Sequence, residues 1–344
     1  MSPVIAELEK RGVTVQKLNM ARSLGGDSPY DCAHALTGSM DFVAGQFEAD
    51  RPDLVLLLGD RYETLGAAQI ATLFRIPIAH IHGGETSEGS FDNEFRHAIT
   101  QLASVHFVAT REARGQVLLF GAHFTSVHLV GAPGLDNIVD LPPREFDGPY
   151  FVICYQPVTA RRAERGNLEI LKALAPTGPF AAYRAMYVGV NNDPGFLEIR
   201  ESFDGRVVQC NGFGPKRYLS LLKYAACCIG NSSSFLIEAP ALGVPTVNVG
   251  DRQKGRLRGD SVLDAPEDAH EIEGVIACAL TFARNMRFTN PYGTPGASKR
   301  IAEILTASEE AVSDAEAACS PESARILRGI ATKHSAALKR LADR

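Results

Sequence analysis

Two well-known nucleotide-binding signatures are missing from this sequence of 344 residues. Neither the GxGxxG pattern of dinucleotide-binding domains nor the GxxxxGK(S/T) pattern of P-loop proteins occurs along the chain. In those patterns, glycines and a lysine at fixed spacing hold the phosphates. The first absence argues against a simple dinucleotide-dependent dehydrogenase, and the second argues against a P-loop nucleoside triphosphatase.

Cysteine pairs, long apolar runs and an excess of positive charge are also lacking. The seven cysteines form no CxxC pair, which favours reduced, buried thiols over a disulfide framework or a zinc site. No apolar run reaches the ~18 residues that span a membrane, and residues 1–12 lack the apolar core of a signal peptide. The net charge of −5 disfavours a general nucleic-acid-binding surface. We therefore expect a cytoplasmic protein without nucleic-acid or membrane partners.

The sequence does contain a regular alternation of short apolar runs and helical patterns. Leu54–Leu58 is apolar at every position, as expected for a strand buried on both faces of a parallel sheet. The segment Leu141–Pro149, rich in proline, glycine and charge, is typical of a linker. We therefore predict an α/β protein with two doubly wound domains, residues 1–143 and 144–305, and a helical tail over residues 306–344.

The expected strands and helices define where a site should lie. The expected strands are Val13–Leu18, Leu54–Leu58, Ile78–Ile81, His106–Val108, Val127–Val130, Phe151–Tyr155, Ala182–Val188, Val207–Gln209, Cys227–Ile229 and Thr246–Val249. The expected helices are Asp41–Ala49, Tyr62–Phe74, Glu94–Ser104, Arg111–Phe120, Ala163–Ala173, Pro215–Tyr224, Phe235–Leu242 and Ala269–Ala283. Ligands of doubly wound sheets bind at the carboxyl ends of the strands, so polar residues that directly follow strands are the candidate site residues.

Candidate acid–base residues follow two strands of the first half. Asp60 and Arg61 come directly after the all-apolar strand, and His82, Glu85 and Asp92 follow the next one along the chain. Carboxylates and imidazoles beside an apolar strand suit proton abstraction at carbon and protonation of a leaving group. Two other interpretations stay open: Asp60 as a helix N-cap, and a metal site formed by the histidines and carboxylates.

Two further residues follow the last of these carboxylates. Arg96 and His97 come one helical turn after Asp92 and could orient its side chain. A histidine at such a position is also compatible with a plain core residue.

Candidate phosphate-binding residues occur in the second half. Ser232 and Ser233 precede a helix that carries Glu238. Free N–H and hydroxyl groups at a helix N-terminus suit a pyrophosphate, and a carboxylate beside it suits ribose hydroxyls. The alternative is a plain serine N-cap.

Three more residues end strands of the second half. Arg252 lies in a glycine-bounded loop rich in long polar side chains, which can neutralise phosphates or form a solvated charge run. Gln156 ends the first strand of this half, and Asn191 lies in a loop whose turn residues explain most of its pattern. The residues alone therefore suggest a site for a diphosphate and a sugar with acid–base groups nearby.

Several motifs together resemble a known family. GDRYE, HIHGGETSEGSFDNEFRHAIT, VGAPGLDNI, GNSSSFLIEAPALGVPTVNVGDRQKGR and NPYGTPGASKRI are similar to motifs of the hydrolysing UDP-N-acetylglucosamine 2-epimerases of bacterial sialic-acid and legionaminic-acid pathways. The resemblance extends from about Arg51 to Leu305. It implies a GT-B fold, in which two Rossmann-like domains hold the substrate between them, and a homo-oligomer, either dimer or tetramer. It also implies release of UDP and N-acetylmannosamine, or a related 2-acetamido sugar, without a metal or nicotinamide cofactor.

The same resemblance implies roles for individual residues. The positions that match UDP contacts are Asn191, Ser232, Ser233, Glu238 and Arg252. The positions that match the sugar side are Asp60, Glu85 and Asp92, with Arg61 near the sugar and phosphate. We predict that Asp60 and Asp92 transfer protons, with His82 or Glu85 assisting.

Three features depart from the family pattern. The family begins with a strand and a Gly-Thr-Arg-Ala-Glu-type loop, so a first strand–helix–strand unit of roughly thirty to forty residues is expected to be missing here. Gln156 stands where many members have histidine, and His82 stands where some have glutamate. Two rival functions stay open: a GT-B glycosyltransferase, and a UDP-sugar-binding protein that has lost catalysis.

Overall fold

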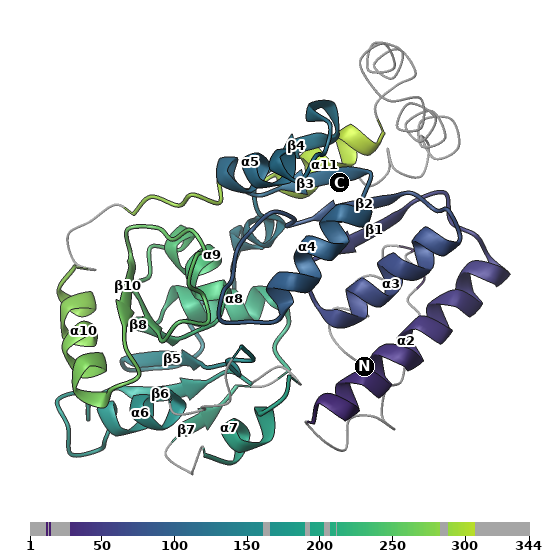
Figure 1. The fold of residues 1–344 in the computed structure, drawn as a ribbon. Helices are drawn as coiled ribbons and strands as arrows, with labels where there is room; N and C mark the ends of the chain where they lie inside the picture. The colour runs from purple at the N-terminus through teal and green to yellow at the C-terminus, as the bar shows by residue number, and fades with distance from the viewer. Residues whose placement is uncertain are drawn as a thin grey trace. The chain divides into compact units, whose positions relative to one another are not determined.

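The structure is a computed structural model, which describes residues 12, 14, 28–160, 166–189, 193–202, 207–210, 212–282 and 288–306. The chain divides into two compact units, each with its own sheet (Figure 1). Among the described residues, the N-terminal unit contains Ala33–Glu85, Asp92–Asp136 and the chain from Tyr292 to Thr306. The C-terminal unit contains Thr86–Phe91, Asn137–Pro291 and the short described stretch that ends at Cys32.

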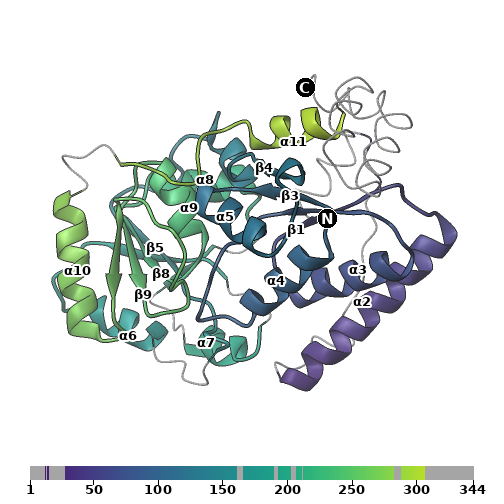
Figure 2. The ribbon, with the colours of Figure 1, turned by 45° about the horizontal axis from the view of Figure 1, so that its top comes forward.

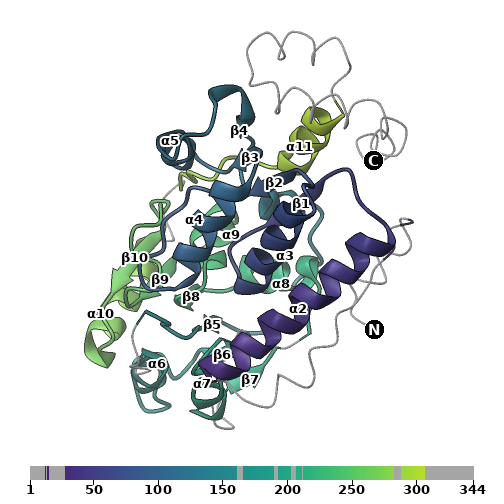
Figure 3. The same ribbon diagram turned by 45° about the vertical axis from the view of Figure 1, so that its right-hand side comes forward.

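The described part of the N-terminal unit has a four-stranded parallel sheet of order β1–β2–β3–β4. Its strands are β1 (Val55–Leu58), β2 (Ile78–Ile81), β3 (Val105–Val108) and β4 (Val127–Leu129). Its first helices are α2 (Pro29–Ala49), α3 (Tyr62–Leu73), α4 (Asp92–Leu102) and α5 (Arg111–Leu119). Figure 3 shows α2 lying along α3, where a side chain at Gly66 would meet Leu36 and Met40.

The first strand is less buried than its sequence predicts. In β1, Leu57 is buried, whereas Leu56 and Leu58 are exposed. The strand is the edge of the described sheet and only the face bearing Leu57 packs in a core cluster, with residues such as Ala68 of α3. The prediction that this strand is buried on both faces is therefore wrong, although it holds for β2 and β3, which are buried throughout.

The last described helix returns to the N-terminal unit. In α11 (Ala297–Leu305), Ile301 and Leu305 belong to the same core cluster as Ile81 and Phe107 of the sheet. The side chain of Arg300 also donates hydrogen bonds to the carbonyl oxygen of Val130 (2.6 and 2.9 Å). The helix at the end of the described chain therefore completes the core of the N-terminal unit.

Asp136 holds the N-terminus of α11. Its carboxylate accepts hydrogen bonds from the backbone N–H groups of Gly296 (2.5 Å), Ala297 (3.0 Å) and Ser298 (2.7 Å). Burial raises the pKa of this carboxyl, but hydrogen bonds to Ser298, Gly296 and Ala297 outweigh burial and hold the pKa below its usual value. An aspartate at this place caps the helix, and its negative charge interacts favourably with the positive end of the helix dipole.

We expect Asp136→Ala to lower the free energy of unfolding by ~0.5–2 kcal/mol, as for other lost N-caps. Because the folded-state pKa lies below the unfolded value of about 4, the contribution is complete above that value and disappears as the pH falls through the folded pKa. Thermal melting of wild type and variant should therefore differ more at pH 7 than at pH 3. The exposed Asp147→Ala is the control, and equal differences at both pH values would contradict the prediction.

The C-terminal unit has a parallel sheet of order β10–β9–β8–β5–β6–β7 in its described residues. The strands are β5 (Tyr150–Cys154), β6 (Arg184–Tyr187), β7 (Val207–Gln209), β8 (Cys227–Gly230), β9 (Thr246–Val249) and β10 (Val262–Ala265). The helices are α6 (Gly166–Ala173), α7 (Phe196–Ser202), α8 (Pro215–Lys223), α9 (Ser234–Ala241) and α10 (Ala269–Phe282).

Helices cover both faces of this sheet. Side chains of a strand alternate between faces, so Phe151 and Ile153 of β5 pack in the cluster that includes residues of α6 and α10. Val152 and Cys154 pack in the opposite cluster with residues of α8 and α9. Figure 2 shows α10 running beside the sheet. Full burial explains why β5 and β8 contain no charged residue and are mostly apolar, whereas the buried β9 also carries Thr246 and Asn248.

The predicted α/β class is confirmed, and most predicted elements appear within a few residues of their expected ends. The helix expected to begin at Asp41 begins at Pro29, because small and polar residues such as Thr37, Gly38 and Ser39 in its first half give no clear apolar spacing. The short elements β10, α7 and α11 were not predicted. Three predictions fall outside the described residues: the strand Val13–Leu18 apart from Thr14, Asn191, and the tail beyond residue 306. The division into domains of residues 1–143 and 144–305 stays a prediction.

Candidate functional site

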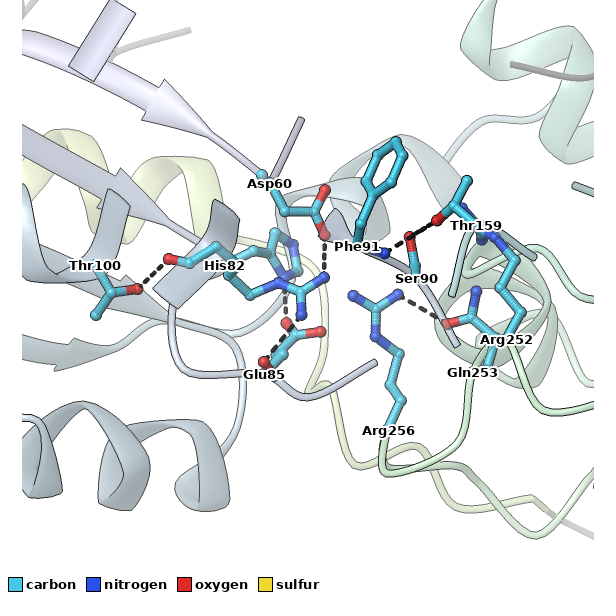
Figure 4. A network of polar contacts seen from close by, with 12 residues as sticks. Asp60, His82, Glu85, Ser90, Phe91, Thr100, Thr159, Arg252, Gln253 and Arg256 are labelled. Carbon is cyan, nitrogen blue, oxygen red and sulfur yellow. Dashed lines mark hydrogen bonds and ion pairs between the residues drawn. The ribbon is translucent and has the colours of Figure 1, made fainter. Parts of the chain in front are cut away.

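Arg96 joins the loops that follow β1 and β2. Its side chain is 1% exposed, forms an ion pair with the Asp60 carboxylate, and donates a hydrogen bond to the Glu85 carbonyl oxygen (2.9 Å) (Figure 4). The N-cap residue of α3 is Arg61, one position after Asp60. A buried cation therefore holds one predicted acid–base side chain and the backbone of another.

His82 and Glu85 form a second contact in the loop after β2. The Nδ1 atom of His82 lies 2.5 Å from a carboxylate oxygen of Glu85, which is buried. His82 has a φ of +65°, a left-handed conformation that costs a non-glycine residue of order 1–3 kcal/mol. Gly84 follows with a φ of +78°, and a Cβ there would lie 2.4 Å from the carbonyl oxygen of Ala113. This strained turn brings the imidazole and the carboxylate together.

Asp92 and Arg61 lie at the starts of two helices. Asp92 is buried and begins α4. Arg61 donates a hydrogen bond to the neighbouring Glu63 carboxylate (3.1 Å), and its guanidinium lies over the Tyr62 ring. His97 packs edge-on against a phenylalanine ring, with 4.9 Å between the ring centroids, and burial lowers its pKa. This packing fits the core-histidine interpretation of His97.

Two buried histidines on adjacent strands make the N-terminal unit sensitive to acid. Burial lowers the pKa of both His80 and His106 to about 4, whereas an unfolded histidine has a pKa near 6.5. Between these values the unfolded chain binds protons that the folded chain does not. Stability should therefore fall as the pH drops from about 6.5 to 4, by up to ~1.4 kcal/mol per pH unit for each ring.

We expect His106→Phe to flatten this dependence. Melting temperatures of wild type and variant, recorded by circular dichroism from pH 7 to pH 4, should converge toward lower pH as one buried ring is removed. The exposed His123→Gln serves as the control and should run parallel to wild type. Parallel curves for His106→Phe and wild type would contradict the prediction.

In the C-terminal unit, Asn231 joins the loops that follow β5, β8 and β9. Its side chain accepts a hydrogen bond from the Gln156 backbone N–H (2.6 Å) and donates one to the Gln156 carbonyl oxygen (2.9 Å). The Gln253 side chain donates to the Asn231 carbonyl oxygen (2.8 Å), and the Arg252 side chain donates to the carbonyl oxygen of Pro157 (3.1 Å). Three predicted or neighbouring site loops therefore share one buried amide.

The serines after β8 are not used as a plain cap. Ser233 is the N-cap residue of α9, but its side chain makes no capping hydrogen bond. The hydroxyl of Ser234 accepts a hydrogen bond from Tyr218 (2.9 Å) instead of serving the helix end. Ser232 contacts the buried thiol of Cys154, whose pKa is raised by burial. The N-terminus of α9 thus keeps hydroxyl and amide groups that can meet an anion.

The segment Thr86–Phe91 packs within the C-terminal unit, although the residues on both sides of it belong to the N-terminal unit. The backbone N–H of Glu88 donates to the carbonyl oxygen of Lys254 (2.9 Å), and their side chains form an ion pair (2.7 Å). The backbone N–H of Phe91 donates to the Thr159 hydroxyl (3.0 Å). The chain between two predicted acid–base residues is therefore fastened to the loops beside Arg252.

Gly89 lies at the closest point of this segment to the Arg252 loop. A Cβ at Gly89 would lie 2.3 Å from the Cα of Arg252 and 2.6 Å from the carbonyl oxygen of Asp251. We expect Gly89→Ala to lower the free energy of unfolding by ~1–3 kcal/mol, because one of the two backbones must move. Urea unfolding measures the loss. The matched control is Gly115→Ala, where a Cβ meets nothing within 4 Å, and similar stabilities for the two variants would contradict the prediction.

Some residues of these networks were not selected from the sequence. Asn231 and Gln253 lie within the motif GNSSSFLIEAPALGVPTVNVGDRQKGR. No local pattern indicates that the Asn231 side chain forms a hydrogen bond with a residue 75 positions earlier in the chain. Thr100 ends one of the family-like motifs and Thr159 lies three residues after Gln156, but neither position indicates its partner in the structure. Among the described residues, no group of three or more His, Cys, Asp or Glu side chains is arranged to hold a metal ion. No helix in the described ranges is long and apolar enough to cross a membrane.

Comparison with known proteins agrees with the sequence resemblance. A family model described as UDP-N-acetylglucosamine 2-epimerase matches residues 10–306. The chain belongs to this family. It is 32% identical over 322 residues to the UDP-N,N'-diacetylbacillosamine 2-epimerase (hydrolyzing) of Legionella pneumophila, covering 86% of this chain and 84% of that protein. It is also 32% identical over 255 residues to the polysialic acid biosynthesis protein P7 of Escherichia coli, covering 70% of this chain and 65% of that protein.

A solved member of the 2-epimerase family has a similar fold. The Methanocaldococcus jannaschii UDP-GlcNAc 2-epimerase, solved in complex with UDP-GlcNAc and UDP, matches with a TM-score of 0.70 at 17% identity. The match covers 87% of this chain and 86% of that chain. The predicted GT-B-type fold, with Rossmann-like α/β units, is thereby confirmed.

Proposed function

We propose that the chain is a hydrolysing UDP-sugar 2-epimerase. It converts UDP-N-acetylglucosamine, or a related UDP-2-acetamido sugar, and water into UDP and the free sugar inverted at C2. The observation that carries the proposal is the network of Asp60, Arg96, Glu85 and His82, which gathers carboxylates and an imidazole at the ends of β1 and β2. Two relatives, at 29% and 32% identity, are named as hydrolyzing 2-epimerases, which supports hydrolysis.

The first chemical step is elimination of UDP. A base removes the proton from C2, the electrons of that bond form a C1–C2 double bond, and the bond from C1 to the UDP oxygen breaks. The products are UDP, a glycal-like intermediate and a protonated base. We assign the proton transfers to Asp60 and Asp92, with Glu85 or His82 assisting, because a carboxylate in a buried setting can accept and return a proton.

The second step is addition of water. The hydroxyl of water adds to C1, and a proton is delivered to C2 on the face opposite to the one it left. Two proton-transfer groups are needed, because one group cannot reach both faces of the ring. The group that gives its proton to C2 takes up the proton left by water, and the base of the first step releases its proton together with UDP. The sum of the two steps therefore converts one UDP-sugar and one water into protonated UDP and one free sugar, with both groups restored.

We assign UDP binding mainly to the C-terminal unit. Ser232, Ser233 and the amide groups at the start of α9 suit the diphosphate, and the guanidinium of Arg252 stabilises the charge that develops on it as it leaves. Glu238 suits the ribose hydroxyls. The further positions assigned to the substrate are Arg61, Gln156 and Asn191, the last of which rests on the sequence resemblance alone.

A time course by NMR in deuterated water tests the proposal. With UDP-N-acetylglucosamine, we expect UDP and free N-acetylmannosamine that carries deuterium at C2. A UDP-linked epimer without UDP release would mean a non-hydrolysing epimerase, and release only in the presence of an acceptor would mean a glycosyltransferase. Binding of UDP without turnover of any donor would mean a binding protein.

A second donor is favoured by the names of two relatives. Both hydrolyzing relatives are named for N,N'-diacetylbacillosamine, a diacetamido sugar, so we propose its UDP conjugate as the alternative substrate. The same NMR assay with both donors at equal concentration gives the ratio of their kcat/KM values. Preference for the diacetamido donor would fix the sugar class without changing the chemistry proposed above.

A further inference from the structure

Gly59 directly precedes Asp60, and residues of β2 hold both its N–H and its C=O group. The Gly59 N–H donates to the carbonyl oxygen of Ile81 (3.1 Å). The Gly59 carbonyl oxygen lies 2.8 Å from Nε2 of the His80 side chain. Gly59 has a φ of +83° and no side chain of its own to fix the turn, so these two bonds set where the next residue begins.

The surroundings of the His80 ring determine which of its nitrogens carries the proton. A carbonyl oxygen only accepts, so Nε2 must be the donor to Gly59. Nδ1 lies 3.2 Å from the hydroxyl oxygen of Thr100, which donates its own proton to the closer Arg96 carbonyl oxygen (2.8 Å). His80 is 0% exposed, and burial lowers its pKa to about 4. The ring is therefore neutral near pH 7, with its single proton directed to the Gly59 carbonyl.

The ring also links the loop to the helix that carries the buried cation. Thr100 lies one turn after Arg96 on α4, and its hydroxyl is 2.8 Å from the Arg96 carbonyl oxygen. Arg96 pairs with the Asp60 carboxylate. The backbone before Asp60 and the partner of its side chain are thus both fixed to α4, the first through His80 and Thr100 and the second directly.

We infer that His80 is a positioning residue, whose ring holds the Gly59–Asp60 turn so that the Asp60 carboxylate keeps its place in the reaction. The inference rests on the proposed function for the role of Asp60. A direct acid–base role for His80 does not fit, because the fully buried ring has no open face toward a substrate. Gly83 packs against the ring so closely that a Cβ there would lie 2.9 Å from Nδ1, which leaves the ring little freedom to turn.

A neighbouring histidine provides a matched control. His106 pairs with His80 in the register of β2 and β3, is equally buried, and has a pKa lowered to about 4 by burial. Within the described residues, its ring makes no hydrogen bond to the Gly59–Asp60 turn. Substitution of either residue removes a buried imidazole from the same sheet, but only substitution of His80 removes the bond to the turn.

The test compares His80→Phe, His80→Gln and His106→Phe by hydrogen–deuterium exchange and by turnover. In His80→Phe we expect faster exchange of the amides from Gly59 to Arg61, and a kcat for UDP release lowered about 10- to 100-fold, as for a misplaced reacting group. The affinity for UDP should stay unchanged, since UDP is assigned to the other unit. His80→Gln, whose amide N–H can still reach the carbonyl, should recover most of the kcat and keep the pH–rate profile of wild type.

Several results would overturn the inference. Unchanged exchange of the turn in His80→Phe would do so, as would an equal loss of kcat in His106→Phe. Loss of one limb of the pH–rate profile in an otherwise folded His80→Gln would mean that the ring itself exchanges protons with the substrate. If wild type released no UDP from any donor, the proposed function would fail, while the exchange comparison would still decide whether His80 holds the turn.

Discussion

Asp60→Asn should lower kcat for UDP release by ~10²–10⁴-fold, the usual worth of a positioned acid or base. Asparagine has nearly the same shape and can still accept a hydrogen bond from Arg96, but the buried guanidinium loses its counter-charge. We therefore expect some loss of stability as well, and kcat is measured at a temperature at which circular dichroism shows the variant to be folded. Asparagine cannot take a proton from C2, and the elimination step loses its base or its acid. Chromatographic measurement of UDP gives kcat, and calorimetric titration with UDP should show an affinity close to that of wild type.

The matched control for this prediction is Asp50→Asn. Asp50 is exposed, directly follows α2 and belongs to neither strand-end loop, and its substitution should leave kcat unchanged. Wild-type turnover in Asp60→Asn would remove Asp60 from the chemistry. The proton-transfer role would then fall to Asp92 and Glu85, which the corresponding amide variants would test.

Arg96→Met should be the most destabilising single change at the site. Removing one partner of a buried ion pair typically costs about 3–5 kcal/mol, and because the Asp60 side chain is 25% exposed we expect a loss near the lower end of this range. Here the substitution leaves the Asp60 carboxylate without its cation and also removes the hydrogen bond to the Glu85 carbonyl oxygen. Urea unfolding should show the loss of stability. Turnover should fall with it, because both loops lose their common anchor.

Two further variants separate charge from geometry. Arg96→Lys keeps the positive charge but cannot reach two partners with a planar fork, so it should recover part of the stability and little of the kcat. Arg217→Met removes an exposed arginine paired with Glu145 and should cost almost nothing, as is usual for surface pairs. Equal losses for Arg96→Met and Arg217→Met would contradict the account of Arg96 as a buried anchor.

The strand-end loops could be predicted from the sequence because local pattern is enough to find them. The predicted strands Ile78–Ile81 and Thr246–Val249 match β2 and β9 residue for residue. Polar residues that follow such strands must lie at the carboxyl edge of a parallel sheet. The same reasoning failed for β1, since a single run of leucines does not reveal whether a second helix covers the strand.

The partners of the site residues could not be predicted in the same way. One partner of Arg96 is Asp60, 36 residues earlier in the chain, and no local pattern indicates this ion pair. Such a pairing depends on how α4 is rotated against the sheet, which is set by packing of residues such as Ile99. Similarly, nothing local indicates that His80 faces a carbonyl oxygen while His106, on the next strand, does not.

The return of α11 to the N-terminal unit affects the order in which the protein can fold during synthesis. Ile301 and Leu305 complete a core whose other members, such as Ile81 and Phe107, leave the ribosome more than 190 residues earlier by the numbering of the chain. Until α11 is synthesised, the first sheet lacks one of its covering helices. Its apolar surface therefore stays uncovered while the entire C-terminal unit is being made. A nascent chain halted before residue 297 should therefore bind chaperones through the N-terminal unit. Expression of the N-terminal unit on its own would require that α11 is included.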